Sequence, residues 1–561
     1  MEAPWGNAKT SGDGGAAPFA PDLGRLATWA HADGTRAVSC ERSNESPQET
    51  RLMFVTATVF VCSALFSNAV SEGEDAWSGW RGPGGNGIAE GSPPIEWGEE
   101  LNVRWKTAIP GKGSSSPIVW GDKVFVTTAV PTVEEEEPEE RPRGGRGFGG
   151  FGRSKPPVEH VFLVVALDRK DGSVVWEQLA NTLTPHQGTH GDGSFASSTP
   201  VTDGERIYAS FGSFGLFAYT LDGEPVWQKD LGDLDIAMSF GEGSSPIVYG
   251  DLLIHNWDHN GDSFIVALDK VTGEERWRQA RESATTWSTP IVVEVEGGPQ
   301  VIVGAGRTIA YDLATGKELW AYGQEQSFGG PPGGREGGRS RDRDRDGDGG
   351  EHEGGDGDGA QQTALAGGLA SFGAQGRGQG GPGQGGRRGG RGGGGGGAGV
   401  ITSPVYHDGV LLFVSGGRRG AFRAIRVAQA KGDVAEDSEA LLWSSEGDTP
   451  HVPSPIAYDG IFYSLKSDSG LLSAFDVQSG ERLYGPERLS GLANAYASPV
   501  AADGHLYFAG RDGTIEVVAA GPEFKSLVVN TLDDEFDASP AIVGNELFLR
   551  GRSHVYCIAE E

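Results

Sequence analysis

The sequence predicts an all-β protein: an eight-bladed β-propeller of four-stranded antiparallel blades, with the ring closed by strands from the N- and C-terminal parts of the chain. Three observations support this prediction. A strand phrase recurs eight times, a second phrase ending in Trp follows it, and the repeats at the two ends of the chain are incomplete. Strand repeats of roughly 40–50 residues are typical of radial arrays.

The first phrase is a Ser or Thr, then Pro, a short apolar strand, a turn with Gly or Asp, and a second strand, as in SSSPIVWGDKVFV. Its prolines are Pro117, Pro200, Pro246, Pro290, Pro404, Pro455, Pro499 and Pro540. Most are separated by roughly 40–50 residues, which is one propeller blade. The apolar alternation and the turn residues favour short antiparallel hairpins.

The second phrase combines Ala-x-Asp, a Gly turn and a Trp, as in ALDKVTGEERW. We expect the Ala to end an inner strand where blades crowd together. The Asp can accept backbone N–H groups of the turn, the Gly supplies a positive φ, and the Trp covers apolar area. These structural roles fall on Trp105, Ala166, Asp168, Gly172, Trp176, Trp227, Ala267, Asp269, Gly273, Trp277, Asp312, Gly316, Trp320, Asp476 and Gly480.

The two ends of the chain carry complementary fragments of one repeat. The last repeat stops at HVYCIAEE without a Trp phrase, whereas NVRWKTAIP, around Trp105, precedes the first Pro without inner strands. We expect Trp105 to open the outer strand of the eighth blade, which would leave no free sheet edge. Seven blades and an unclosed array are the alternatives.

The Trp phrase resembles the repeat of the pyrroloquinoline-quinone (PQQ) propellers. That family includes quinoprotein alcohol dehydrogenases and non-catalytic relatives such as the outer-membrane-protein assembly lipoprotein. The resemblance covers Trp77 to the C-terminus apart from two inserts, and WSGWRGPGGNG is similar to the lead-in of uncharacterised bacterial PQQ-like repeat proteins. It implies the propeller fold, since the motif packs blades whether or not a quinone is bound.

The resemblance does not extend to the chemistry of the dehydrogenases. Their paired adjacent cysteines are absent, because Cys40, Cys62 and Cys557 are not neighbours. Their calcium ligands and catalytic Asp cannot be placed on matching residues. We therefore expect a non-catalytic binding or protein-interaction scaffold. A PQQ-dependent dehydrogenase that oxidises an alcohol or sugar is the first alternative, and a metal-dependent hydrolase is the second. PQQ and calcium stay open as cofactors, with neither firmly implied.

Composition narrows the partners and the compartment. The net charge of −32 argues against nucleic acid and against adhesion to anionic lipid. We expect a monomer that binds a protein, peptide or glycan at one face of the propeller, in the periplasm or outside the cell.

The N-terminal region predicts export. Residues 1–50 lack apolar periodicity and are expected to be disordered or untranslated. Residues 51–70 contain the apolar run LMFVTATVFVCSALF, the length of a signal h-region, with a cleavage site predicted after Ala69. An uncleaved membrane anchor is the alternative. An arm over 77–104 then leads into the propeller at 105–561.

Two inserts interrupt the propeller, at 131–157 and 324–399. Both are rich in Gly and charged residues and bury too little apolar area to fold alone, so we expect disordered loops. The second insert contains a match to a calcium-binding EF-hand loop, which competes with a charged disordered tract. Its ligands would be Asp342, Asp344, Asp346 and Glu353.

Histidines cluster in two connections, TPHQGTHGDGSF and HNWDHNGD. If both loops rise on one face of the ring, their side chains could ligate zinc or a similar ion. The candidate ligands are His186, His190, His255, Asp258 and His259. Hydrogen bonding within the loops is the competing interpretation. Trp257, Trp287 and Tyr496 are candidates for lining one mouth of the channel, or for packing between blades.

Overall fold

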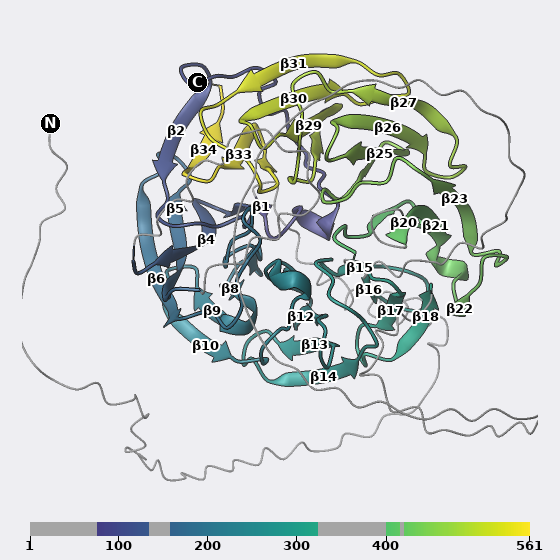
Figure 1. Ribbon diagram of the computed structural model, residues 1–561, viewed down its shortest axis with the longest axis horizontal. Coiled ribbons are helices and arrows are strands. Elements are labelled where there is room, and N and C mark those ends of the chain that lie inside the picture. Colours follow the sequence, from purple (N-terminus) through teal and green to yellow (C-terminus); the bar gives the residue numbers. More distant parts are fainter. Residues whose placement is uncertain (1–75, 134–156, 324–399, 416–419, 561) are drawn as a thin grey trace, which may run out of the picture. The chain divides into compact units, whose positions relative to one another are not determined.

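A computed structural model describes residues 76–133, 157–323, 400–415 and 420–560 as a ring of small antiparallel sheets (Figure 1). All of these residues belong to the compact unit Ala69–Glu561. The leader 1–50, the segment 51–70 and most of both inserts, including the EF-hand match, lie outside the described residues. Within the described part, no helix is long and apolar enough to cross a membrane.

The first four blades follow one another along the chain, each from an inner to an outer strand. Blade 1 consists of β3 (Ile118–Trp120), β4 (Lys123–Pro131), β5 (His160–Asp168) and β6 (Val174–Leu183). Blade 2 consists of β7 (Val201–Thr202), β8 (Arg206–Ser210), β9 (Leu216–Thr220) and β10 (Pro225–Lys229). Blade 3 consists of β11 (Ile247–Tyr249), β12 (Leu252–Trp257), β13 (Phe264–Asp269) and β14 (Glu275–Ala280). Blade 4 consists of β15 (Ile291–Val293), β16 (Gln300–Val303), β17 (Thr308–Asp312) and β18 (Glu318–Tyr322).

The remaining blades repeat this order, and the last takes its outer strand from the beginning of the propeller. Blade 5 consists of β19 (Val405–His407), β20 (Val410–Ser415), β21 (Ala421–Arg426) and β23 (Leu441–Glu446). Blade 6 consists of β24 (Ile456–Tyr458), β25 (Ile461–Lys466), β26 (Leu471–Asp476) and β27 (Arg482–Arg488). Blade 7 consists of β28 (Val500–Ala502), β29 (His505–Ala509), β30 (Thr514–Ala519) and β31 (Ser526–Thr531). Blade 8 consists of β32 (Ala541–Val543), β33 (Glu546–Arg550), β34 (His554–Ile558) and β2 (Val103–Ala108).

Two blades carry a fifth strand that the repeat does not predict. β1 (Ala76–Trp77) pairs with the inner strand of blade 1, and β22 (Gly432–Val434) pairs in parallel with the outer strand of blade 4. Each extra strand covers a row of backbone groups that would otherwise be a free edge. Short 3₁₀ turns lie between strands: η1 (Pro83–Gly85), η2 (Gly212–Phe214), η3 (Ala237–Ser239) and η5 (Val427–Gln429).

Closure of the ring by the two ends of the chain is confirmed. β2 pairs antiparallel with β34, so that Trp105 lies opposite Cys557 and Lys106 opposite Tyr556. The Cys557 thiol is fully buried, and this burial raises its pKa to about 12. It therefore packs as an apolar group in the closing sheet.

The Trp of the second phrase packs within its own blade and donates its indole N–H to the next one. The indole of Trp227 lies against Gly273, where φ is +72°, and its Nε1 donates to the carbonyl of Lys270 at 3.1 Å. Trp105, Trp176, Trp277 and Trp443 make equivalent bonds to Arg169, Leu221, Leu313 and Val477 at 2.8–3.0 Å. Trp320 differs, since its Nε1 donates to Gln300 of the same blade.

The Asp of the second phrase organises the turn that receives this indole. The carboxylates of Asp168, Asp269, Asp312 and Asp476 each accept backbone N–H groups two or three residues ahead. Ala267 and Ala310 lie opposite Trp277 and Trp320 in their sheets and are fully buried. The phrase thus joins a turn in one blade to an aromatic ring of the preceding blade.

The hydroxyl before each repeat proline links neighbouring blades. In each link, the backbone N–H of one Ser or Thr donates to the hydroxyl of its counterpart in the next blade. The series begins with the Ser116 N–H, and each residue that follows accepts the N–H of the residue named before it. In order, the accepting hydroxyls and their N···O distances are Thr199 (2.9 Å), Ser245 (3.0 Å), Thr289 (3.2 Å), Ser403 (2.8 Å), Ser454 (2.9 Å), Ser498 (2.9 Å) and Ser539 (2.9 Å). We call this chain of bonds the hydroxyl belt. It explains why the repeat places Ser or Thr, rather than any other small residue, before the proline.

The arm before β2 runs inside the ring. β1 pairs with blade 1, and the carbonyl of Ser78 accepts the Thr202 N–H of blade 2 at 2.8 Å. Gly85 in η1 lies beside Ile291 of blade 4, and Ile88 bridges to Ala501 of blade 7. All four partners belong to innermost strands, so residues 76–88 occupy the centre of the ring, where Figure 1 shows β1.

Candidate functional site

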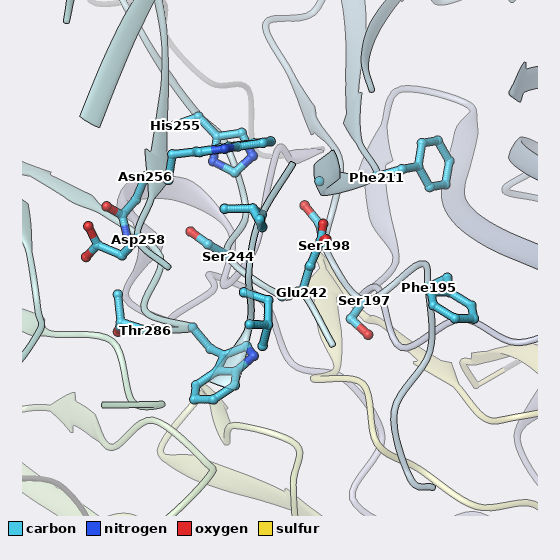
Figure 2. A pocket seen from close by; sticks show the side chains of 16 residues that line it. Phe195, Ser197, Ser198, Phe211, Glu242, Ser244, His255, Asn256, Asp258 and Thr286 are labelled. Atoms are coloured by element: carbon cyan, nitrogen blue, oxygen red, sulfur yellow. The ribbon is translucent and has the colours of Figure 1, made fainter. Parts of the chain in front are cut away.

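A pocket between blades 2 and 3 is lined by several polar side chains, among them Glu242, His255, Asn256 and Asp258 (Figure 2). It lies where the connections between blades meet the turns that follow β8 and β12. We call it the interblade pocket. Its cavity has a volume of about 20 Å³, which is enough for one or two water-sized groups. Partial exposure of Glu242, Gly243 and Trp287 leaves it open to the surface.

The local sequence allows the connection before blade 3 to enter this space. In GEGSSP, Gly241 has a φ of +92°, and Gly243 lies close against the ring of Trp287. A side chain at Gly212 would collide with the Glu242 carboxylate, so glycine there lets η2 approach it. The glycines therefore allow Glu242, in the connection before blade 3, to lie directly against the turn of blade 2.

The Glu242 carboxylate is held by one residue. Ser213 donates its backbone N–H to one oxygen at 2.7 Å and its hydroxyl to the other at 2.6 Å. Burial raises the pKa of Glu242 to about 7 despite these bonds, with Asp233 adding repulsion and His186 opposing it. No Lys, Arg or His of the described chain forms an ion pair with this carboxylate.

Three further side chains place polar atoms in the pocket without a hydrogen-bond partner among the described residues. They are the Ser198 hydroxyl, both amide atoms of Asn256, and Nδ1 of His255. All three residues are 2–5 % exposed. Buried polar atoms are normally paired, so these atoms indicate a site for water or a ligand.

His255 contributes a neutral imidazole. Its Nε2 lies 2.8 Å from the Ser210 hydroxyl, and burial lowers its pKa to about 4. The ring is therefore uncharged near neutral pH, and it offers Nδ1 to the pocket as a donor or an acceptor.

The second carboxylate at the pocket, Asp258, is already neutralised. Arg281 donates to both of its oxygens at 2.7 and 3.0 Å, and Ser283 adds a bond at 3.0 Å. The same Arg281 donates to the Tyr311 hydroxyl at 2.7 Å. Both members of the ion pair are essentially inaccessible, so Asp258 has a structural role.

The predicted His and Asp ligands are not gathered around one ion. His186 Nε2 bonds the carbonyl of Leu234 at 2.9 Å, and His259 Nδ1 accepts the Asp235 N–H at 3.0 Å. The two histidine loops thus meet at residues 234–235, but their nitrogens hold backbone groups there. His190 lies apart, beside Asp192 at 3.4 Å. Across the described residues, no group of three or more His, Cys, Asp or Glu is placed to hold a metal.

The three aromatic candidates have different surroundings. Trp257 lines the interblade pocket, is fully buried and stacks on Phe264 with ring centroids 6.1 Å apart. Trp287 also lines the pocket, and its Nε1 donates to the Gly241 carbonyl at 2.7 Å. Tyr496 belongs to a separate cluster.

That separate cluster joins the first histidine loop to blade 7. Tyr496 donates to Asp192 at 3.3 Å, and its ring lies 4.1 Å from the Arg511 guanidinium carbon. Arg511 forms ion pairs with Asp192 at 3.0 Å and Asp537 at 2.6 Å. The loop before blade 2 is therefore fastened across this face of the ring.

Sequence reasoning identified His255, Asp258 and both tryptophans of the pocket but missed Glu242, Ser198 and Asn256. A glutamate between two glycines directly before the repeat phrase SSP is an available signal, because no other repeat has it. Nothing in the sequence marks Asn256 as unbonded, since that depends on what lies opposite it in space.

A family model described as "Outer membrane protein assembly factor BamB" matches residues 162–344. No curated protein matches the chain. Among solved structures, a europium-containing methanol dehydrogenase is 10% identical, with 86% of this chain and 91% of that chain covered and a TM-score of 0.50. BamB from Moraxella catarrhalis is 14% identical, with 72% and 92% covered and a TM-score of 0.42. The quinohemoprotein alcohol dehydrogenase from Comamonas testosteroni is 10% identical, with 87% and 81% covered and a TM-score of 0.49.

The family model and the methanol dehydrogenase structure confirm the resemblance to the PQQ-like propellers. The eight blades fit that family, and structures of such low identity show the fold alone.

Proposed function

We propose that this chain, whose eight blades fit the PQQ-like propeller family, is an exported, non-catalytic binding scaffold. Its ligand would be a protein, peptide or glycan bound on the face that carries the interblade pocket. The observation that carries the proposal is the arm at 76–88, which lies at the centre of the ring and pairs with inner strands of blades 1, 2 and 7.

The residues present do not fit a quinone cofactor at the interblade pocket. A ligand of that size needs a cavity of about 300 Å³ or more, whereas this one admits one or two water-sized groups. The adjacent cysteines of the dehydrogenases are also missing from the sequence. A dehydrogenase with its cofactor at this pocket is therefore disfavoured.

The surface of the binding face supports recognition of a partner. It combines aromatic side chains, such as Trp287 and Phe240, with charged side chains held by ion pairs, such as Asp192 and Arg511. Rigid aromatic and Arg side chains are enriched where proteins bind one another. The matching family model is named for an outer membrane protein assembly factor, which supports an extracytoplasmic, protein-binding role.

Reconstitution with quinone and calcium tests this proposal. Purified full-length protein is incubated with PQQ and calcium chloride, freed of excess cofactor, and assayed for bound quinone and for dye-linked oxidation of alcohols and sugars. We expect neither stoichiometric quinone nor dye reduction. One quinone per chain together with alcohol- or sugar-dependent dye reduction would overturn the scaffold and establish the dehydrogenase.

The hydrolase alternative has its own measurement. Metal content is determined in protein purified without added ions, for the native sequence and for a His190→Ala, His259→Ala double variant. We expect no stoichiometric zinc in either protein. Zinc that is retained by the native protein and lost from the double variant would support the hydrolase instead.

A further inference from the structure

The interblade pocket contains a carboxylate that lacks a counter-charge. Of its two acidic side chains, Asp258 is neutralised by Arg281, whereas Glu242 is bonded, among the described residues, by Ser213 alone. Ionising a largely desolvated carboxylate without a cation beside it is costly, because low polarity disfavours the charged form, and this raises the pKa of the partly exposed Glu242. The pocket is therefore electrostatically incomplete.

The other open atoms of the pocket suit a cation that donates hydrogen bonds. The Ser198 hydroxyl and the Asn256 carbonyl oxygen can both accept, and neither has a partner among the described residues. Figure 2 shows these residues around the same space as Glu242. Trp257 and Trp287 add aromatic lining, to which cations are attracted.

We propose that the interblade pocket binds a primary ammonium group, with Glu242 as its counter-charge and Ser198 and Asn256 as hydrogen-bond acceptors. This deepens the scaffold function proposed above and rests on it, because it gives the partner a defining chemical feature. The ammonium belongs either to a lysine side chain of a bound protein or to a free alkylamine, and the experiment below separates these sources.

The size of the cavity selects the kind of cation. An ammonium group is about as large as a water molecule and has three donors, so it matches a cavity for one or two waters. The planar guanidinium of arginine is larger and needs a flat, forked partner. The net charge of −32 favours the approach of cationic partners in general, and the cavity then discriminates among them.

The charge of Glu242 links binding to pH. The groups that face it are His186, Asp233, neutral His255 and the closed pair Asp258–Arg281. With a pKa of about 7, Glu242 is largely protonated at pH 6 and largely ionised at pH 8. An ammonium binds the ionised form, so we expect about tenfold tighter binding at pH 8 than at pH 6, with release of up to one proton.

Titration calorimetry on the full-length protein tests the proposal. The probes are n-propylammonium chloride and the peptide acetyl-alanyl-lysyl-alanine amide. The controls are the arginine and Nε-acetyl-lysine versions of the peptide, and potassium chloride. Measurements at pH 6 and pH 8, in two buffers of different ionisation enthalpy, count the protons released. We expect both ammonium probes to bind more tightly than any control, and the lysine peptide to exceed propylammonium if the source is a protein.

Matched variants assign the binding to the pocket. Glu242→Gln should lower the affinity at pH 8 by at least about tenfold and abolish its pH dependence. Ser198→Ala should lower the affinity several-fold and keep the pH dependence. Glu516→Gln is the control: Glu516 is fully buried and, like Glu242, bonded by a backbone N–H and a Ser hydroxyl, but it does not line this pocket.

Several outcomes would overturn the proposal: no binding of either ammonium probe at millimolar concentration, equal binding of acetyl-lysine, competition by potassium at equal concentration, or unchanged affinity in Glu242→Gln. If Glu242→Gln does not fold, full retention of binding in Ser198→Ala would contradict the assignment. None of these results affects quinone uptake, so failure of the ammonium site and failure of the scaffold are distinguishable.

Discussion

At the scale of single residues, two carboxylates in one pocket differ in charge state because they have different neighbours. Asp258 and Glu242 line the same pocket, but Arg281 neutralises the first and only Ser213 bonds the second. Burial without a counter-charge raises the pKa of Glu242 to about 7. The difference lies in the neighbours of each carboxylate rather than in its own chemistry.

Glu242 makes the stability of the protein depend on pH. Its folded-state pKa of about 7 exceeds its ordinary value of 4.5, so the protonated form stabilises the fold. This contribution is complete below about pH 4.5 and is lost as the pH rises through 7. Gln at this position cannot ionise. We therefore expect the free energy of unfolding of Glu242→Gln, relative to that of the native protein, to be on the order of 2 kcal/mol higher at pH 8 than at pH 5. Urea unfolding at the two pH values measures this, and a constant difference would contradict it.

Glycine is required in the turn that receives an indole for two reasons, a positive φ and the closeness of the indole ring. Gly273 has a φ of +72°, and a Cβ there would lie 2.8 Å from Trp227, whereas Gly250 has a φ of +56° with nothing within 4 Å of its Cβ. Gly250→Ala should therefore cost about 1 kcal/mol for its backbone alone. Gly273→Ala should cost about 1–3 kcal/mol more, because it also displaces the indole. Thermal unfolding of both variants tests this, and equal losses would show that the indole contact is unimportant.

At the scale of elements, the blades are joined by two kinds of recurring contact. The Trp of one blade covers the Gly turn of the next on the outside, and the hydroxyl belt joins the inner strands. Apolar side chains fill the space between: Phe422 of blade 5 and Phe462 of blade 6 meet edge to face with centroids 5.1 Å apart. The two repeated sequence phrases therefore supply mainly residues that contact a neighbouring blade, which is why they recur along the chain.

The hydroxyl belt predicts different effects for two chemically identical substitutions. Ser454 accepts the Ser403 N–H at 2.9 Å, so Ser454→Ala should cost about 1–2 kcal/mol by leaving a buried N–H unpaired. The Ser116 hydroxyl is equally buried but has no partner among the described residues, so Ser116→Ala should change stability by less than about 0.5 kcal/mol. Both values follow from urea unfolding. A loss at Ser116 as large as that at Ser454 would rule out the belt as the cause.

At the scale of the whole molecule, the N-terminal part of the propeller performs two tasks. Residues 76–88 occupy the centre of the ring, and residues 103–108 supply the strand that closes it. Between them, Ser92 donates to Asn545 and Asp503, and Trp97 stacks on Tyr507 at 6.4 Å. The arm therefore fastens the first and last blades to each other.

Removal of this segment should open the ring. A chain that begins at Pro110 lacks β2 and the arm, which leaves β34 as a free edge able to pair with another chain. We expect its melting temperature to fall by at least several degrees and dimers or larger species to form, whereas a chain that begins at Val70 should behave like the full protein. Calorimetry and size-exclusion chromatography with light scattering measure both. A stable monomer beginning at Pro110 would show that closure is dispensable.

The sequence predicted most of the fold because propeller contacts are repetitive. Most blades meet their neighbours through the same turn and hydroxyl, and five of them through an indole, so the pattern recurs along the chain and the missing piece at each end is visible. The extra strands β1 and β22 escaped prediction because each occurs once. A single short strand has no periodicity to reveal it.

The sequence by itself determined the number of blades, the closing pair of strands and the turn chemistry, since these depend on residues close together in the chain and on repetition. Only the tertiary structure decided that the arm lies inside the ring, that His186 and His259 hold backbone groups, and that Glu242 has no counter-charge among the described residues. The physical reason is that the charge state and bonding of a buried group depend on everything around it. At the interblade pocket, those surroundings come from three connections between blades and the turns that follow β8 and β12, which only folding brings together.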